Sequence, residues 1–220
     1  MAVSTKIQKI LVAGILIVIG LALVVYGSLA FMRQYQATHE SRPLSLGKVV
    51  TESASQPDET PPSDDCMLQT VAERAPHILT IPDIGVDSCV QQVGNDPSGT
   101  IAAPSNVHLA GWYVNSVAPG EKGVSLVDGH VSGRYSEAIF KNLGKLTPGS
   151  IISVQRGNGQ TVKFAVVDVA SYPSDQVMKV LFEQLEGVDS QLTLITCGGV
   201  FDKSSQTYAD RVVVRAKLAS

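Results

Sequence analysis

An uncharged apolar stretch near the amino terminus, from Ile10 to Met32, constrains the chain more than any other feature. As an α-helix it rises about 34 Å, at about 1.5 Å per residue, which is enough to cross a hydrocarbon core of about 30 Å. The small residues Ser28–Ala30 also permit a cleaved signal peptide, but the apolar part of such a peptide is normally only about 7–15 residues long. We therefore predict an uncleaved transmembrane signal anchor over residues 10–32, preceded by a cytoplasmic segment over residues 1–9.

The charges that flank this stretch give its expected orientation. Lys6 and Lys9 precede it, whereas Arg33 and Arg42 follow it, so the positive-inside bias favours a cytoplasmic amino terminus only mildly. The chain is then expected to cross the cell membrane once and to place its main domain outside the cytoplasm. The whole chain has a net charge of −3 and no basic run, which argues against nucleic acid as a partner.

A linker is expected between the anchor and the rest of the chain. Residues 33–65 include TESASQPDETPPSDD, which is rich in Ser, Pro, Thr and acidic residues and offers almost nothing to bury. This composition is typical of disordered segments, so we predict a disordered stalk over residues 33–65. Residues 66–220 remain for a single globular domain, which is long enough to bury a core.

Three cysteines, Cys66, Cys89 and Cys197, give an odd count. In an oxidising compartment this count favours one disulfide and one remaining thiol. Cys66 opens the amphipathic stretch CMLQTVAERA, and Cys89 lies in the strand-like VDSCVQQV. A Cys66–Cys89 disulfide is therefore a hypothesis, which requires their Cα atoms to lie within about 7 Å of each other.

From Ile78 onward, short apolar runs recur between turn residues and predict mainly β structure. Two runs in HILTIPDIGVDSCVQQV are separated by Pro82-Asp83 and Gly85, and two later runs flank an Asn158-Gly159 hairpin turn. Helical patterns are few, in SEAIFKNLGKL and SDQVMKVLFEQLEG. Strands at short spacing with few helices predict a closed or nearly closed β-barrel.

Cys197 follows the β-rich run LTLIT and precedes Gly198-Gly199. A strand end before a glycine-rich loop exposes side chains at the rim of a sheet, where catalytic groups often lie. Free cysteine is also among the most buried residue types, so the local sequence leaves both roles open. A thiol with its ordinary pKa of about 8.5 needs a neighbouring base or cation to act as a nucleophile at neutral pH.

His130, in LVDGHVSG, is the expected partner of this thiol. It follows a short β run and a glycine, and an imidazole can serve first as base and then as acid to a leaving amine. His108 competes with it but lies in a Pro/Asn/Gly-rich loop, while His39 and His77 are expected at the surface. The histidines and cysteines lack the spacing of metal ligands, so we expect no metal and no cofactor.

Two arginines share one face of the strand-like segment YADRVVVRA. On a strand, Arg211 and Arg215 lie on one side together with Val213, while Val212 and Val214 lie on the other. A guanidinium presents a planar fork of donors that can hold a substrate carbonyl or an oxyanion. A solvated strand face is the commoner fate of an arginine, so this feature is weak by itself.

Taken together, DGH after one strand, TLITC in another and an arginine near the start of the last strand resemble the sortases, the membrane-anchored cysteine transpeptidases of bacterial cell surfaces. The resemblance covers Ile78 to the end of the chain. WYVNSVAPGEKG and ITCGGVFD are most similar to class F and related actinobacterial-type sortases. The resemblance implies a mainly β fold: a sortase-type closed barrel of about eight strands with a few short helices, preceded by one transmembrane helix, with a catalytic domain over residues 66–220.

The resemblance also implies a reaction and its residues. Cys197 would attack the carbonyl after Thr in an LPXTG-like sorting signal of a surface protein, which leaves a thioacyl enzyme. A peptidoglycan precursor or a pilin lysine would then supply the amine that resolves it. His130, Cys197 and Arg211 are the implied catalytic set, with Thr196 as a substrate or oxyanion contact and Arg215 as the alternative to Arg211.

Asp128 departs from the small or uncharged residue that many sortases have before Gly-His, and a carboxylate there is expected to raise the pKa of His130. Two other functions compete with the sortase interpretation. An L,D-transpeptidase is disfavoured because those enzymes place His and Cys close together in sequence, unlike His130 and Cys197. The second competing function is a catalytically inactive, membrane-tethered β-barrel that only binds its partner. Selective labelling of Cys197 by a thiol reagent would favour the enzyme, whereas an unreactive Cys197 would favour the binding module.

Overall fold

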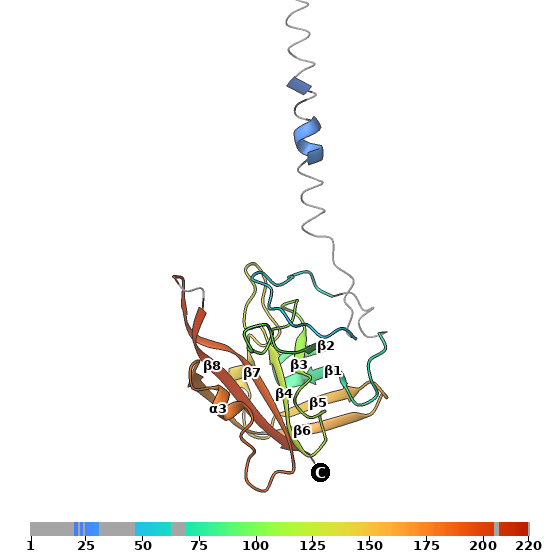
Figure 1. Cartoon of the computed structure of the whole chain (residues 1–220), viewed down its shortest axis with the longest axis vertical. Helices are drawn as coiled ribbons and strands as arrows, with labels where there is room; N and C mark the ends of the chain where they lie inside the picture. The colour runs from blue at the N-terminus through green and yellow to red at the C-terminus, as the bar shows by residue number, and fades with distance from the viewer. Residues whose placement is uncertain are drawn as a thin grey trace, which may run out of the picture. The chain divides into compact units, whose positions relative to one another are not determined.

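The computed structural model describes residues 20–21, 23, 25–30, 47–62, 69–204 and 207–219. The chain divides into two units, residues 1–42 and residues 43–220. In the first unit the described residues, between 20 and 30, are helical, and the rest of the expected anchor over 10–32 lies outside the described residues (Figure 1). Within the part of the chain that the structure describes, no helix combines the length and the apolar character needed to cross a membrane. The anchor therefore stays a prediction.

Eight strands of the second unit close into a barrel in the order β1-β2-β3-β4-β7-β8-β6-β5 (Figure 1). The elements in chain order are β1 (Pro76–Ile81), the 3₁₀ helix η1 (Pro82–Ile84), β2 (Val86–Val93), β3 (Ala110–Tyr113), β4 (Gly123–Gly129), the 3₁₀ helix η2 (Leu143–Lys145), β5 (Ile151–Arg156), β6 (Thr161–Pro173), the helix α3 (Met178–Leu181), β7 (Ser190–Asp202) and β8 (Thr207–Leu218). The predicted mainly β, closed barrel with few helices is confirmed.

Most neighbouring strands are antiparallel, but two pairs are parallel, β2 with β3 and β4 with β7. The antiparallel pairs include the predicted hairpin of β5 and β6, in which Gln155 lies opposite Thr161 and the turn residue Gly159 has a φ of 80°. The parallel pair β4–β7 matters for function, because parallel strands bring their carboxyl ends to the same edge of a sheet. The segments that follow the apolar runs of β4 and β7 therefore meet.

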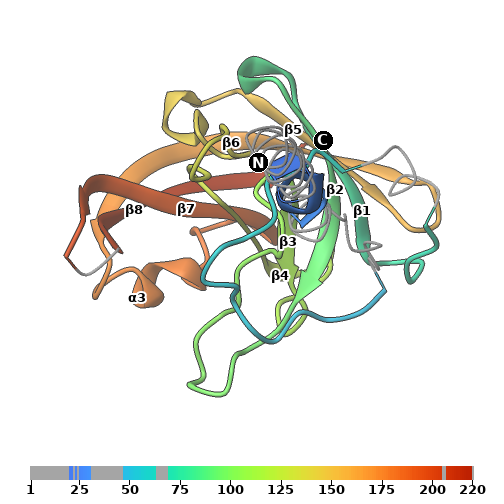
Figure 2. The ribbon, with the colours of Figure 1, turned by 90° about the horizontal axis from the view of Figure 1, so that it is seen from above.

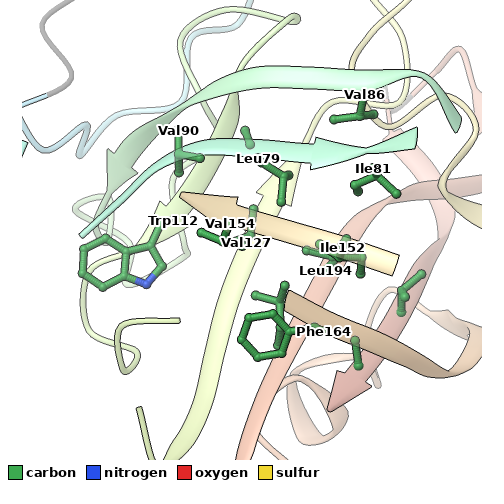
Figure 3. Close-up of a cluster of buried hydrophobic side chains, with 14 of the residues drawn as sticks. Leu79, Ile81, Val86, Val90, Trp112, Val127, Ile152, Val154, Phe164 and Leu194 are labelled. Carbon is green, nitrogen blue, oxygen red and sulfur yellow. The ribbon is translucent and has the colours of Figure 1, made fainter. Parts of the chain in front are cut away.

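Alternate strand residues fill the interior of the barrel. Figure 3 shows Leu79 of β1, Val154 of β5, Phe164 of β6 and Leu194 of β7 in this cluster, and each is 1% exposed or less. Burying apolar surface stabilises the fold by about 25 cal/mol per Å². The interior is thus a packed core, and chemistry has to take place on the outside of the barrel or at its rim.

A second cluster covers part of the outer face. Val177 and Leu181, at α3, pack with Leu126 of β4 and Val213 of β8, and α3 lies beside β7 and β8 in both views (Figure 2). Val214 belongs to the interior cluster, so the predicted two-faced pattern of β8 is present. The helix is only one turn, shorter than SDQVMKVLFEQLEG suggests, and of its residues and their neighbours Val177 and Leu181, spaced i and i+4, are the buried ones.

Residues 47–62, which fall within the expected disordered stalk, are hydrogen-bonded to the barrel unit; we call residues 49–62 the strap. Val50 bridges Val93 in parallel, and Asp58 bridges Asn106 in the same sense. Figure 1 shows the strap in blue-green beside the loops at one end of the barrel. Composition indicates disorder because few of these side chains can be buried, but backbone hydrogen bonds hold the strap instead. Residues 33–46 and 63–65 of the expected stalk lie outside the described residues.

Candidate active site

The parallel pairing of β4 and β7 brings His130 next to Cys197. In this pair Asp128 lies opposite Ile195. His130, two residues after Asp128, is then level with Cys197, two residues after Ile195. Neighbouring strands are about 4.8 Å apart. The imidazole and the thiol therefore project from neighbouring segments of the sheet, on the outer face of the barrel.

Arg211 completes the group from the other side of β7. In the antiparallel pair of β7 and β8, Cys197 lies directly opposite Arg211, and directly opposed residues project from the same face of a sheet. The guanidinium donates through Nη1 to the carbonyl oxygens of Tyr208, at 3.0 Å, and of Asp210, at 2.8 Å. These bonds hold the arginine close to its own strand, beside the sulfur.

Strand β7 does not end at Cys197, as the glycine pair after it suggested. It continues to Asp202 through an irregularity between Gly198 and Phe201. Gly199 has a φ of 73°, and a Cβ there would collide with the carboxylate of Asp210. The glycines therefore form a bulge that bends the strand beside the cysteine, a device often found next to active sites.

The imidazole of His130 is held by a backbone carbonyl that sequence reasoning missed. Its Nε2 lies 2.8 Å from the carbonyl oxygen of Pro104. A carbonyl can only accept, so Nε2 carries the hydrogen and Nδ1 is the nitrogen that can take a proton. Burial lowers the pKa of His130, and the bond to Pro104 opposes this only in part. No side-chain pattern could have pointed to Pro104, because its contribution is a main-chain oxygen.

Cys197 is a free, half-buried thiol. Burial raises its pKa, the positive charge of Arg211 lowers it, and the negative charge of Asp128 raises it, with a net upward shift. The lowered pKa of His130 and the raised pKa of Cys197 both favour the neutral form of each group. Burial at this site thus disfavours an imidazolium–thiolate ion pair.

Asp128 behaves differently from the expectation that it raises the pKa of His130. Burial raises the pKa of Asp128 itself well above its ordinary value, and its buried Oδ1 has no hydrogen-bond partner among the described residues. This oxygen faces Gly111, where a Cβ would lie only 2.5 Å away. A carboxyl group so enclosed favours its neutral form, and the pKa of His130 is lowered instead.

We predict that Asp128→Asn lowers the pH at which Cys197 becomes reactive. The negative charge of Asp128 is one of the causes that raise the pKa of Cys197, so replacing this ionisable carboxyl by an amide shifts that pKa downward. The rate of alkylation by iodoacetamide, measured against pH, gives the midpoint. Asp87→Asn, at an exposed carboxylate of β2, is the matched control. An unchanged or higher midpoint in Asp128→Asn contradicts the prediction.

Thr196 lies on the inner face of β7, opposite to the face of Cys197, and is 4% exposed. Its hydroxyl donates to the carbonyl oxygen of Gly129 at 2.7 Å, which ties β7 to the residue before His130. The contact observed is structural, unlike the expected contact with substrate or oxyanion, because alternation along a strand sends neighbouring side chains to opposite faces.

We predict that Thr196→Val destabilises the fold by about 1–3 kcal/mol, since it leaves the buried Gly129 oxygen without its donor while keeping the shape of the side chain. Thr196→Ser keeps the hydroxyl and is the control, expected within about 1 kcal/mol of the wild type. Urea unfolding gives both free energies. Wild-type stability combined with a raised KM in Thr196→Val would instead favour a substrate contact.

Arg215, the alternative to Arg211, is engaged elsewhere. It lies opposite Thr193 rather than Cys197 and donates from Nε and Nη2 to the two carboxylate oxygens of Asp168, at 2.9 and 2.7 Å. It lies four positions along the strand from Arg211, about 13 Å away at about 3.3 Å per residue. Its role in the structure is to join β8 to β6.

The remaining sequence candidates lie outside this group. The ring of His108 contacts the carbonyl oxygen of Glu59 in the strap, at 3.0 Å. His77 belongs to β1, and His39 lies outside the described residues. Cys89 is disulfide-bonded, but Cys66 also lies outside the described residues, so their pairing stays a prediction.

A free thiol, an imidazole and a guanidinium on one outer face of a closed barrel are the groups of an enzyme that transfers acyl groups through cysteine. Comparison with protein families specifies the class further. The family model described as Sortase domain matches residues 79–219. This chain belongs to the sortase family and is a cysteine transpeptidase of that family.

Solved sortase structures share the fold. Sortase A from Corynebacterium diphtheriae, a lid mutant, has 23% identity and a TM-score of 0.51 over 66% of this chain and 70% of that chain. Sortase C1 of GBS Pilus Island 1 has 20% identity and a TM-score of 0.51 over 69% and 67%. Sortase C-1 from Actinomyces oris has 21% identity and a TM-score of 0.50 over 77% and 89%. Comparison with curated proteins gives no match. These neighbours come from several sortase classes, so assignment to class F stays a prediction.

Proposed function

We propose that this sortase cleaves an LPXTG-like sorting signal near the carboxyl terminus of a surface protein and joins the acyl part to an amine. The observation that supports this most directly is that His130, the residue after β4, continues the register of β4 and β7 toward Cys197, which lies opposite Arg211 of β8. A thiol that forms an acyl intermediate, an acid–base imidazole and a fixed cation for the oxyanion are the three functions that such a transfer needs.

The reaction begins from neutral groups. The sulfur of Cys197 bonds to the substrate carbonyl carbon while its proton passes to Nδ1 of His130, and the guanidinium of Arg211 donates to the oxyanion. Collapse of this intermediate breaks the C–N bond, and His130 returns the proton to the leaving amine. The thioacyl enzyme is then attacked by the acceptor amine, which forms the new amide and restores the thiol. Water in place of the amine gives hydrolysis.

The setting of the reaction belongs to the same proposal. The uncharged stretch over 10–32 anchors the enzyme in the cell membrane by a single pass, with residues 66–220 outside the cytoplasm, and its closest class is F or a related actinobacterial type. Its acceptor is a peptidoglycan precursor or a pilin lysine. The apolar length of the stretch and the flanking lysines support this topology.

The test is incubation of the full-length protein, in detergent, with a small library of sorting-signal peptides and with amines that mimic the two acceptors. We expect mass spectrometry to show cleavage after Thr and a new amide with one amine class, together with a thioacyl adduct on Cys197. Absence of both products across the library, from protein whose Cys197 is alkylated normally, would contradict the proposal.

A further inference from the structure

Two loops flank the catalytic-site histidine, and the strap contacts both. The first is the loop over residues 103–107, which supplies the Pro104 carbonyl that accepts the hydrogen bond from His130. The second, over residues 131–137, follows His130 directly in the chain. The imidazole therefore depends on two segments that do not belong to the strands of the barrel.

The strap holds the residues on each side of Pro104. The Ala103 amide donates to Oγ of Ser53 at 3.0 Å, and the amide of Asp58 donates to the carbonyl oxygen of Ser105 at 2.9 Å. On its other side, Ser105 is fixed to the barrel, because its amide donates to Oε1 of the buried Gln91 of β2 at 2.9 Å. The loop is thus held between the barrel and the strap.

Glu59 of the strap binds the second loop through its carboxylate. The amides of Arg134, Tyr135 and Ser136 all donate to it, the last two at 2.9 and 2.8 Å, and the hydroxyl of Ser136 adds a bond of 2.9 Å. Partial burial raises the pKa of Glu59, but these donors outweigh it and lower the pKa overall. A Cβ at Gly133 would lie 2.8 Å from the carboxylate, so glycine there makes room for it.

The second loop also reaches the arginine of the site. Oγ of Ser132 lies 2.9 Å from the hydroxyl of Tyr208, and the backbone carbonyl of Tyr208 accepts a hydrogen bond from Arg211. The loop that Glu59 holds therefore continues directly from His130 in the chain and is linked to Arg211 by hydrogen bonds through Tyr208. The strap that supplies Glu59 lies earlier in the chain than all eight strands of the barrel.

We infer that the strap is a positioning element of the active site and that Glu59 is a positioning residue for His130, one that acts through the loop over 131–137 without touching substrate. The inference rests on the proposed role of His130 in catalysis. It adds to that role a contribution from a segment whose composition resembles a stalk. A chain shortened to begin at residue 65 would lack this contribution even though all eight strands remain.

The experiment compares Glu59→Ala and Glu59→Gln in the full-length protein with Glu52→Ala, which removes an exposed glutamate of the same strap. Glu59→Ala is expected to lower kcat about ten- to hundredfold with KM changed less than about twofold, since a shift of about 1 Å in a catalytic group has effects of this size. Glu59→Gln keeps one acceptor oxygen and should fall between. Glu52→Ala should match the wild type.

A second measurement is independent of turnover. NMR titration of His130 in selectively labelled protein is expected to show its pKa move up toward the ordinary value in Glu59→Ala, because a loosened loop admits water to the imidazole. If the wild type processes no peptide, the proposed function fails, while this titration still decides the role of the strap. The inference is overturned if Glu59→Ala matches Glu52→Ala in kcat and titration, or if it lowers only the free energy of unfolding.

Discussion

Cys197→Ala is expected to reduce transpeptidation at least about 10⁴-fold, because the thiol forms the covalent bond to the acyl group. Cys197 is half-buried on the outer face, outside the interior core cluster, so loss of its sulfur should leave the fold intact. Intact-mass analysis should show a thioacyl adduct in the wild type and none in the variant, while circular dichroism and the unfolding midpoint stay close to the wild type.

The control for this prediction is Cys197→Ser, which keeps a nucleophilic atom of nearly the same size but with a much higher pKa. We expect it to be almost as inactive as Cys197→Ala and to bind the sorting-signal peptide with a Kd near that of the wild type. The outcome that contradicts the assignment is turnover in Cys197→Ala. If instead the wild type binds peptide, does not turn it over and is not labelled by thiol reagents, the chain is a binding module.

Most of the fold could be predicted from the two-residue periodicity of the strands in the sequence. Short apolar runs and the Asn158-Gly159 turn predicted a closed barrel, and alternation in YADRVVVRA placed Arg211 and Val214 on opposite faces, as the structure has them. These features are local: a strand's inside and outside follow from a period of two residues. The parallel register that brings His130 beside Cys197 is not local. The sequence indicated their association from the chemistry of a thiol and an imidazole at two strand ends and from the resemblance to sortases, but it did not indicate which strands pair.

What the sequence did not predict depends on backbone groups and on burial. The Pro104 carbonyl and the amides that bind Glu59 carry no side-chain signal, so neither the support of His130 nor the order of the strap could be seen in composition. The pKa of His130 was expected to rise because Asp128 is a neighbouring carboxylate in sequence. Burial of both groups reverses that expectation, and burial is known only once the loops are placed.

Arg211→Ala is expected to lower kcat about 10²–10³-fold, the usual cost of removing one donor to an oxyanion. It should also raise the pKa of Cys197, because the guanidinium is the positive charge that favours the thiolate. The loss should appear in kcat more than in KM, since the oxyanion exists only in the transition state and intermediate. Single-turnover kinetics and pH-dependent alkylation measure the two effects. Arg211→Lys keeps the charge without the planar fork and should recover part of the activity.

Arg215→Ala is the matched arginine control, on the same face of β8 but four residues along. Its side chain is 16% exposed and pairs with Asp168 through two hydrogen bonds, so its loss should destabilise the fold by about 1–3 kcal/mol and leave the kcat of the folded protein near wild type. Arg211→Ala is thus expected to affect mainly catalysis, and Arg215→Ala mainly the stability of the fold. If Arg215→Ala alone abolishes acyl transfer in folded protein, Arg211 is not the residue that binds the oxyanion. Its position opposite Cys197 would then be no guide to the catalytic arginine.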